Sequence, residues 1–481
     1  MMHSDEVVRP LNAKEASYLC TRDQFTNFAF GLTLAGVVVS RNDAANALES
    51  VARRNPLLRV RVALRSASLV FVARKAPDVV VADDMVVVAD SAVRLDSHLE
   101  AEISTPIPVL AHTARLTIIP REGDTDVIFT FAHAAFDAMC ASTIVADWIH
   151  IVTSTPLPVS QDMDPLQNVT VPPNDMIPTS ERTWPNFFRF LWTVASLQFW
   201  IFMYMPVLLK VATPPEDIRA AFKDVVTEEA KNMQLTRLTT HFLGAEETKK
   251  VVTRAKTLGV TVSGLIVGSL AAAIASDKLL PSKSPKAAKS SQTQAQKMAL
   301  LAAIAVNGRP GLDIPSTHNG SFNYGLLVPL SSVTIVSEKS VAVEAAIQST
   351  RANLDLKRRL LAKEPLHLAR FLPTYDPFKN PVAEGCHPPA MRLAPAKPAD
   401  ALPVAFVLSN LGSVRVGVPA VRAFRMVSTL RPDINTRRVE VNVVSVDGLM
   451  SVTFAHLNGM VLRADLELLV ERFLLGLLGD E

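Results

Sequence analysis

The spacing of apolar and polar residues along the first third of the chain predicts helices that alternate with short strands. Residues 45–62 read as a helix that runs into a strand, and the segment Arg53-Arg-Asn-Pro-Leu-Leu-Arg59 separates the two. A second helix is expected at 141–151. Runs rich in β-branched residues predict strands at 69–73, 79–81, 86–89, 114–119 and 127–131. This mixture predicts an α/β (α+β) protein in which helices pack on a mixed sheet.

The proline-rich stretch 153–185 interrupts this pattern, and a second set of elements follows it. A charged helix is predicted at 246–257, followed by an apolar helix at 261–276. The tract 277–297 is rich in Lys, Ser, Gln and Ala, so it is expected to be a mobile surface insertion. Later strands are expected at 302–306, 324–333, 404–408 and 439–454, and a further helix at 464–478.

These patterns divide the chain into an N-terminal lobe at 1–185, an apolar crossover or membrane-contacting segment at 186–215, and a C-terminal lobe at 216–481. Residues 191–209 carry no charge, and their length nearly reaches the roughly 20 residues of a membrane-spanning helix. Three tryptophans, Trp184, Trp192 and Trp200, lie in or beside this run. Two interpretations stay open: a buried crossover helix, or peripheral contact of residues 187–210 with a membrane leaflet.

Composition narrows the classes of function. A length of 481 residues with 49% hydrophobic residues can fill sizeable cores. The net charge of +3 comes from scattered basic residues, so no nucleic-acid partner is expected. Cys20, Cys140 and Cys386 show no ligand spacing, so no metal site or disulfide framework is expected. The first residues lack a secretory signal, and a cytoplasmic location is the expectation.

The most informative chemistry lies at the end of the strand predicted at 127–131. His133 follows this apolar run, and Asp137 comes at the fourth position after it. A neutral imidazole can take a proton from a hydroxyl group while the oxygen attacks a carbonyl, because it titrates near neutral pH. The spacing H-x-x-x-D is not specific by itself, so the context has to support it.

That context resembles the chloramphenicol-acetyltransferase-like superfamily, in particular its alcohol acetyltransferase, mycolipid acyltransferase and peptide-synthetase condensation branches. Five signatures look like the family's RHPxLR, HxxxD, NxRP and GxFxN elements and its SNLG turn, and they occur in the family's order. In this chain they are Arg53–Arg59, His133–Asp137, Ala305–Pro310, Gly320–Asn323 and Leu408–Gly412.

The chain also departs from the family's pattern. Asn55 stands in place of the usual histidine of the first element, and Ala138 replaces the glycine that usually follows the aspartate. Ala132 stands where condensation domains carry a first histidine, and no DFGW-like motif is found. These departures favour a free-standing enzyme that transfers an acyl group to an alcohol.

The resemblance implies two lobes, each a mixed sheet flanked by helices, with an active-site tunnel between them. It also implies acyl-coenzyme A as co-substrate, a small or lipophilic alcohol as acceptor, and His133 as the general base. Asp137 would have a structural role and turn away from the imidazole to pair with an arginine. Arg309 is the best partner in the sequence, because a guanidinium binds a carboxylate in a bidentate manner.

Candidates for the remaining roles are less distinctive. Ser321, Asn323, Ser409 and Asn410 could donate hydrogen bonds to the developing oxyanion, although ordinary turn chemistry explains these residue types equally well. Lys249, Arg254 and Lys256 could meet coenzyme A phosphates, but a charged helix face is more often simply solvated. A donor held on a carrier protein and a family member that binds an acyl ligand without turnover remain as alternatives.

Overall fold

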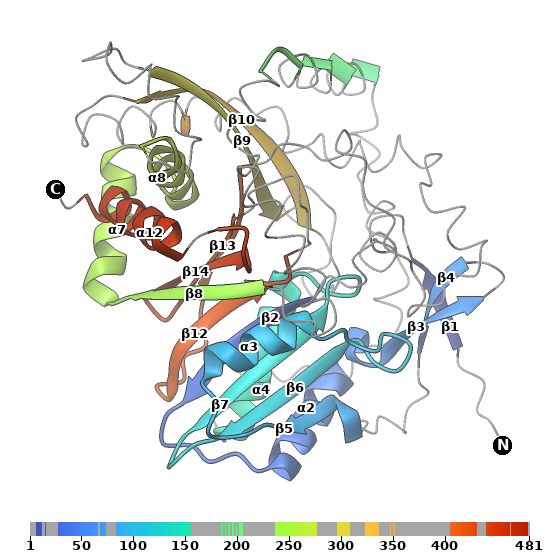
Figure 1. Cartoon of the computed structure of the whole chain (residues 1–481). Helices are drawn as coiled ribbons and strands as arrows, with labels where there is room; N and C mark the ends of the chain where they lie inside the picture. The colour runs from blue at the N-terminus through green and yellow to red at the C-terminus, as the bar shows by residue number, and fades with distance from the viewer. Residues whose placement is uncertain are drawn as a thin grey trace.

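The computed structural model describes residues 6–11, 15, 27–65, 68–73, 83–154, 236–276, 296–307, 323–335, 405–430, 439–461 and 463–479, with 347, 350, 351 and single positions between 184 and 204. Within these ranges the predicted α/β class is confirmed, because two mixed sheets carry helices on their faces (Figure 1).

The first sheet has five strands in the order β12-β2-β7-β6-β5. Their bounds are Val421–Ser428 (β12), Asn27–Leu34 (β2), Thr125–Ala132 (β7), Ala114–Pro120 (β6) and Val86–Val88 (β5). Helices α2 (Arg41–Arg54) and α4 (Ala138–Val152) pack on one face, together with the alternate side chains Phe28, Phe30 and Leu32 of β2. Helix α3 (Leu95–Ser104) covers the other face. Both faces of the sheet are therefore covered, and every residue of β7 is buried.

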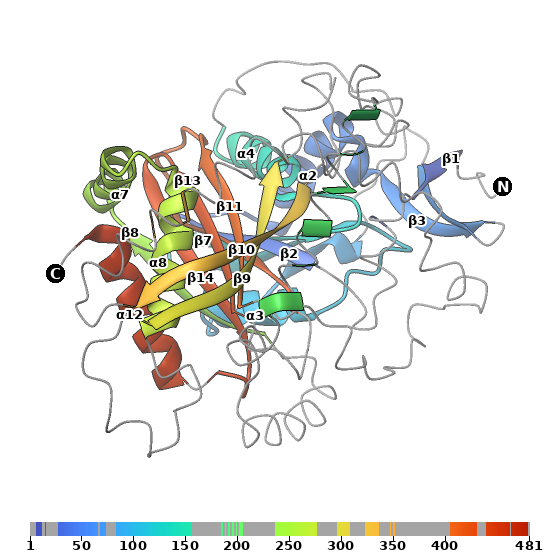
Figure 2. The same cartoon turned by 90° about the horizontal axis from the view of Figure 1, so that it is seen from above.

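A smaller sheet in the order β1-β4-β3 flanks this lobe. Its strands are Glu6–Pro10 (β1), Ser68–Ala73 (β4) and Val60–Arg65 (β3), and Figure 2 shows it on the side of the molecule opposite α7 and α12. A bidentate ion pair, with both distances 2.7 Å, joins Arg9 to the buried Glu15, and the guanidinium lies over the Phe71 ring. The short helix η1 (Pro56–Leu58) falls in the predicted break between α2 and β3.

The second sheet has six strands in the order β10-β9-β11-β13-β14-β8. Their bounds are Asn323–Ile335 (β10), Gln296–Asn307 (β9), Phe406–Val414 (β11), Val439–Val446 (β13), Leu449–Leu457 (β14) and Thr236–Leu243 (β8). Helices α7 (Ala245–Thr257), α8 (Val262–Ser276) and α12 (Arg463–Leu478) bury one face of this sheet. The predicted lobe of mixed sheet and helices is therefore confirmed for the second half as well.

Strands β13 and β14 form a hairpin, whereas the sequence predicted a single run over 439–454. Asp447 and Gly448 have positive φ values of 49° and 89°, as the two central residues of a tight hairpin turn require. Along β13, Val441 and Val443 point into the core under the helices. Because side chains alternate along a strand, Glu440 and Asn442 point to the opposite face, toward the first sheet.

Strand β12 joins the two halves of the molecule. It belongs to the second half by sequence, yet it pairs with β2, with Met426 opposite Phe30 and Ser428 opposite Phe28. The predicted division at 185 and 215 did not include this exchange of a strand. Helix α3 adds a second connection, because Glu100 accepts hydrogen bonds from Arg237 (3.1 Å) and from the Leu238 amide (2.8 Å) of β8.

The predicted SNLG turn is part of a strand. Residues 408–412 continue β11, and the pairing with β13 shifts between Asn410 and Gly412, which marks a β-bulge. Gly412 has a φ of 80°, a conformation that a residue with a Cβ rarely adopts. The predicted strand at 79–81 lies outside the described residues, as does the predicted insertion except for Gln296 and Lys297, which belong to β9.

The apolar segment 186–215 is described only in part. Every described residue between 184 and 204 is helical and exposed, and the choice between a crossover helix and membrane contact stays a prediction. The large apolar side chains among these described residues are Trp184, Phe188, Leu191, Trp192, Phe199, Phe202 and Met203. Among the described residues, no single helix is long and apolar enough to cross a membrane, although α7 and α8, bent by 93°, pass such a test as a pair.

Candidate active site

His133 is the first residue after β7, at the start of a tight turn. The Ala132 carbonyl accepts hydrogen bonds from the backbone amides of Ala135 (3.0 Å) and Phe136 (3.2 Å), and the Ala132 amide donates to Thr113 (2.9 Å). The strand is held on both sides by β2 and β6, so the turn begins at a fixed point. His133 is therefore presented by the rigid centre of the sheet, which suits a group that has to act in one geometry.

The imidazole of His133 lies against aromatic side chains. Its ring meets the edge of Phe28 with 5.2 Å between ring centroids, and Phe28 stacks on Phe131 at 5.5 Å. Phe136, within the same turn, packs edge-on against Phe131 at 5.1 Å. His133 itself is only partly buried. An apolar floor therefore lies under one part of the imidazole ring.

Asp137 begins helix α4. Its carboxylate accepts a hydrogen bond from the Cys140 amide (2.9 Å), and its side chain is fully buried. This is an N-cap, which satisfies one of the amides that a helix leaves without a partner at its start. The predicted partner Arg309 lies outside the described residues, so the ion pair between them stays a prediction.

Strand β11 brings two further predicted residues to the junction of the sheets. The side-chain oxygen of Asn410 accepts a hydrogen bond from the Gly412 backbone amide (2.9 Å). The side-chain nitrogen of Asn410 donates to the Ser263 hydroxyl (2.9 Å) in the first turn of α8. Both ends of this side chain therefore hold the bulge and the helix in place. Ser409 lies opposite Asn442 of β13, on the face turned away from the helices. Leu411 packs in the same core as Phe136, which places this part of β11 beside the His133 turn.

The sequence analysis missed a polar cluster at the junction: Ser428 of β12 with Glu440 and Asn442 of β13. The Ser428 hydroxyl lies 3.0 Å from the Asn442 side-chain oxygen and within hydrogen-bonding distance of the Glu440 carboxylate. Asn442 is 1% exposed, and its side-chain nitrogen has no hydrogen-bond partner among the described residues. Two polar residues at alternate positions of an otherwise apolar strand were the available signal.

This cluster lies close to His133. Ser428 is the register partner of Phe28, and Phe28 is the register partner of Phe131 on β7. Ser428 shares a face of the sheet with Met426 and Phe424, which pack in the same core as Phe28. Neighbouring strands are about 5 Å apart, so β12 and β7 are separated by roughly 10 Å.

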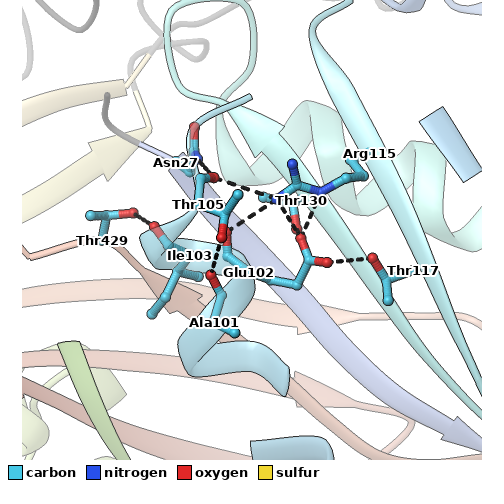
Figure 3. A network of polar contacts seen from close by, with 9 residues as sticks. All are labelled: Asn27, Ala101, Glu102, Ile103, Thr105, Arg115, Thr117, Thr130 and Thr429. Atoms are coloured by element: carbon cyan, nitrogen blue, oxygen red, sulfur yellow. Dashed lines mark hydrogen bonds and ion pairs between the residues drawn. The ribbon is translucent and has the colours of Figure 1, made fainter. Parts of the chain in front are cut away.

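A second polar network holds the opposite face of the same sheet (Figure 3). Glu102 of α3 accepts hydrogen bonds from Arg115 (2.8 Å), Thr117 (2.5 Å) and Thr130 (3.2 Å). The carbonyls at the end of α3 accept from Asn27 (2.9 Å) and Thr429 (2.6 Å). Asn27 lies opposite Ala132, so this network fixes the end of β7 from which His133 projects.

The basic residues of α7 do not join this site. Lys249 and Arg254 line an open hollow of about 730 Å³ together with Leu478 and Gly479 at the end of α12, and Lys256 is exposed on the same helix. Helix α7 packs on the helix-covered face of the second sheet, whereas His133 adjoins the other face. Contact with coenzyme A phosphates therefore stays a prediction without geometric support from the described residues.

The other predicted site residues are described less fully. Asn323 is the first residue of β10 and lies opposite Asn307, and Ser321 is outside the described residues. Within the described ranges, no three His, Cys, Asp or Glu side chains gather as they would around a metal ion.

Known proteins resemble this chain in structure but not in sequence. No protein-family model matches the chain, and no curated protein matches it by sequence. The chain is similar in structure to the trichothecene 15-O-acetyltransferase TRI3 from Fusarium sporotrichioides, with a TM-score of 0.66, 12% identity, and coverage of 98% of this chain and 94% of that one.

Two further solved structures extend this likeness over nearly the whole chain. The condensation domain of the monacolin K polyketide synthase MokA has a TM-score of 0.60 and 14% identity, with coverage of 99% of this chain and 98% of that one. Polyketide synthase associated protein 5 from Mycobacterium tuberculosis has a TM-score of 0.55 and 12% identity, with 98% coverage of each chain. The two-lobed chloramphenicol-acetyltransferase-like fold that the motifs implied is therefore confirmed, and identities this low establish the fold alone.

Proposed function

We propose that the protein is an O-acyltransferase that moves an acetyl or longer acyl group from a coenzyme A thioester to an alcohol. The observation that carries the proposal is the position of His133, which leaves the rigid end of β7 at the junction of the two sheets with its ring on an aromatic floor. The fold, which it shares with an O-acetyltransferase and with condensation domains, supports the same class of chemistry.

The reaction needs no covalent enzyme intermediate. Neutral His133 accepts the proton of the acceptor hydroxyl while the hydroxyl oxygen attacks the thioester carbonyl carbon. The tetrahedral intermediate then collapses, the carbon–sulfur bond breaks, and the imidazolium returns the proton to the departing thiolate. Asp137 contributes by capping α4, which fixes the turn that carries His133.

Thiol release from acetyl- and longer acyl-coenzyme A, measured with a panel of short and lipophilic alcohols, tests this proposal. We expect alcohol-dependent release that His133→Ala reduces by roughly 10²- to 10⁴-fold. His98→Ala is the matched control, because His98 is a residue of α3 whose ring makes an exposed hydrogen bond with the Asp90 carbonyl. Equal activity of His133→Ala and His98→Ala would contradict the role of His133.

A donor on a carrier-protein phosphopantetheine is the second candidate, supported by the structural likeness to condensation domains. Comparing coenzyme A with carrier-linked donors separates the two. A protein that binds acyl thioesters but releases no thiol with either donor would instead be a binding protein.

We further propose that the acceptor is lipophilic and that the exposed apolar side chains described between 184 and 203 contact a membrane surface. They include two tryptophans with Phe188, Phe199 and Phe202, and amphipathic aromatic rings favour the membrane interface. Trp192→Ser combined with Phe199→Ser should abolish sedimentation with liposomes. The control pair Val38→Ser and Leu110→Ser removes exposed apolar side chains elsewhere, and equal sedimentation of both double variants would contradict the contact.

A further inference from the structure

Asn442 occupies a rigid position at the junction of the two sheets. It lies in the middle of β13, with Ser409 of β11 on one side and Thr453 of β14 on the other. The Ser428 hydroxyl lies 3.0 Å from the Asn442 side-chain oxygen and also contacts the Glu440 carboxylate. These contacts confine the oxygen end of the amide.

The nitrogen end of the Asn442 amide makes no hydrogen bond within the described part of the fold. The side-chain nitrogen is buried, and no described group accepts its protons. Buried donors without a partner are rare in native proteins and call for an explanation. Neighbouring groups on the same face differ in this respect, because the hydroxyls of Thr240 and Thr453 lie 3.2 Å apart and pair with each other.

We infer that the Asn442 amide donates a hydrogen bond to a substrate oxygen held at His133, and that Ser428 and Glu440 orient the amide for this task. The inference rests on the proposed acyl transfer and assigns a further residue to it. Two substrate oxygens have the required chemistry: the thioester carbonyl oxygen, which gains negative charge during attack, and a polar oxygen on the acceptor.

The position of the amide supports this assignment. Ser428, which touches Asn442, lies on the face of the first sheet that also carries Phe28, and the Phe28 ring touches His133. A substrate whose reacting hydroxyl lies at the imidazole therefore has its neighbouring oxygens on the side of Asn442. A preorganised amide of this kind acts without reorganising during the reaction.

Steady-state kinetics of Asn442→Asp, an isosteric change that removes both N–H donors, tests the inference. If the partner is the thioester carbonyl, kcat falls by roughly 10²- to 10³-fold while the KM values stay close to wild type. If the partner is an oxygen on the acceptor, the acceptor KM rises at least about tenfold, and only for acceptors that carry a second oxygen. Either result supports the hydrogen bond and identifies its partner.

Thr453→Val is the matched control, because Thr453 is fully buried, faces the same side and is the register partner of Asn442. Rates and KM values of Asn442→Asp that match those of Thr453→Val would overturn the inference. Ser428→Ala should change the same kinetic parameter as Asn442→Asp in the same direction but by a smaller factor, because the amide is then present but less well oriented. A change in melting temperature without this kinetic change would show a structural role and contradict the positioning role of Ser428.

The experiment also separates this inference from the proposed function. Wild-type protein that releases no thiol with any acceptor would refute the proposed acyl transfer. The form of the inference that involves the thioester carbonyl would fall with it, and equilibrium binding of the alcohol panel then decides the form that involves the acceptor, which requires weaker binding of alcohols with a second oxygen by Asn442→Asp than by Thr453→Val. Equal affinities in both variants would overturn it.

Discussion

Two buried polar clusters lie on opposite faces of one sheet, and they differ in how completely their hydrogen bonds are satisfied. The network around Glu102 uses the carboxylate, the Arg115 guanidinium and the carbonyls at the end of α3 within the protein (Figure 3). The cluster of Ser428, Glu440 and Asn442 leaves one buried amide nitrogen without a described partner. The first arrangement fixes the fold, and we infer that the second keeps a donor for a substrate oxygen.

The adjacent residues Ser428 and Thr429 show the difference most directly. Ser428 points to the face that carries His133, whereas the Thr429 hydroxyl donates to the Ile103 carbonyl on the side of α3. One short segment of the chain thus contributes to a closed network on one side and to an open cluster on the other. We therefore expect the Glu102 network, whose hydrogen bonds are made within the protein (the closed network), to govern stability. We expect the cluster of Ser428, Glu440 and Asn442 (the open cluster) to govern turnover.

The largest expected effect is on the closed network. Glu102→Ala leaves Arg115, whose side chain is 10% exposed, without its carboxylate partner, and it should lower the free energy of unfolding by about 3–5 kcal/mol. Urea denaturation measures this loss, with the exposed Glu122→Ala as control. Turnover per folded molecule should stay near wild type, and a selective loss of kcat would break the distinction between the clusters.

His456 tests whether a missing partner alone indicates function, because its Nδ1 atom is also buried without a described partner. Burial, and secondarily the charge of Arg237, lower the pKa of His456 to about 4. The unfolded chain, with a pKa near ~6.5, binds the proton more readily, so stability is full above about pH 6.5 and falls toward pH 4, by about 3 kcal/mol.

Chemical denaturation of wild type and His456→Gln across this pH range checks the effect. The variant should lose most of the pH dependence, and its turnover at neutral pH should be unchanged. A large loss of turnover in His456→Gln would contradict the view that this histidine serves stability alone.

Asp137 connects the site to the fold, and two substitutions separate its contacts. Asp137→Ala removes the cap of α4 and should lower the free energy of unfolding by at least about 1 kcal/mol. Asp137→Asn keeps a good capping residue but removes the charge, so any loss in this variant reports on the predicted pair with Arg309. Thermal denaturation of both variants measures the two contributions, and Asp137→Ala with unchanged stability would refute the structural role.

The smallest expected effect is also the sharpest comparison. Thr429→Val should lower the free energy of unfolding by about 1 kcal/mol with little change in kcat, because it removes one hydrogen bond from the closed network. Ser428→Ala should instead change kcat or the acceptor KM clearly, because it removes the hydroxyl that orients the Asn442 amide. Melting curves and rate measurements on both variants check this. Equal stabilities and equal kinetic parameters of the two variants would show that the two faces of the sheet do not differ in their roles.

Local patterns along the sequence predicted most of the elements that present His133. The strand over 127–131, the helix after it and the break at Pro56 are all found, because each depends on residues close together in the chain. The entry of β12 into the first sheet was missed, because its pairing with β2 joins residues almost 400 positions apart and leaves no local signal.

The site was predicted in the same uneven way. His133 and Asp137 follow from a short motif. The expected pair of Asp137 with Arg309 stays a prediction, and the cap that Asp137 forms on α4 was not predicted. The SNLG segment was expected to be a turn, but it forms a bulge within β11 between Asn410 and Gly412. The Asn410 side chain makes hydrogen bonds with the Gly412 amide and with Ser263 there. Asn442 was not considered, because its importance depends on a burial and a facing strand that only the folded chain shows.

The most direct test of the account is alcohol-dependent thiol release by wild type and His133→Ala, measured at equal amounts of folded protein. The account predicts release by the wild type and a loss of roughly 10²- to 10⁴-fold in the variant, with melting temperatures that agree. Release that is undiminished in His133→Ala would contradict the assignment of His133 as the general base.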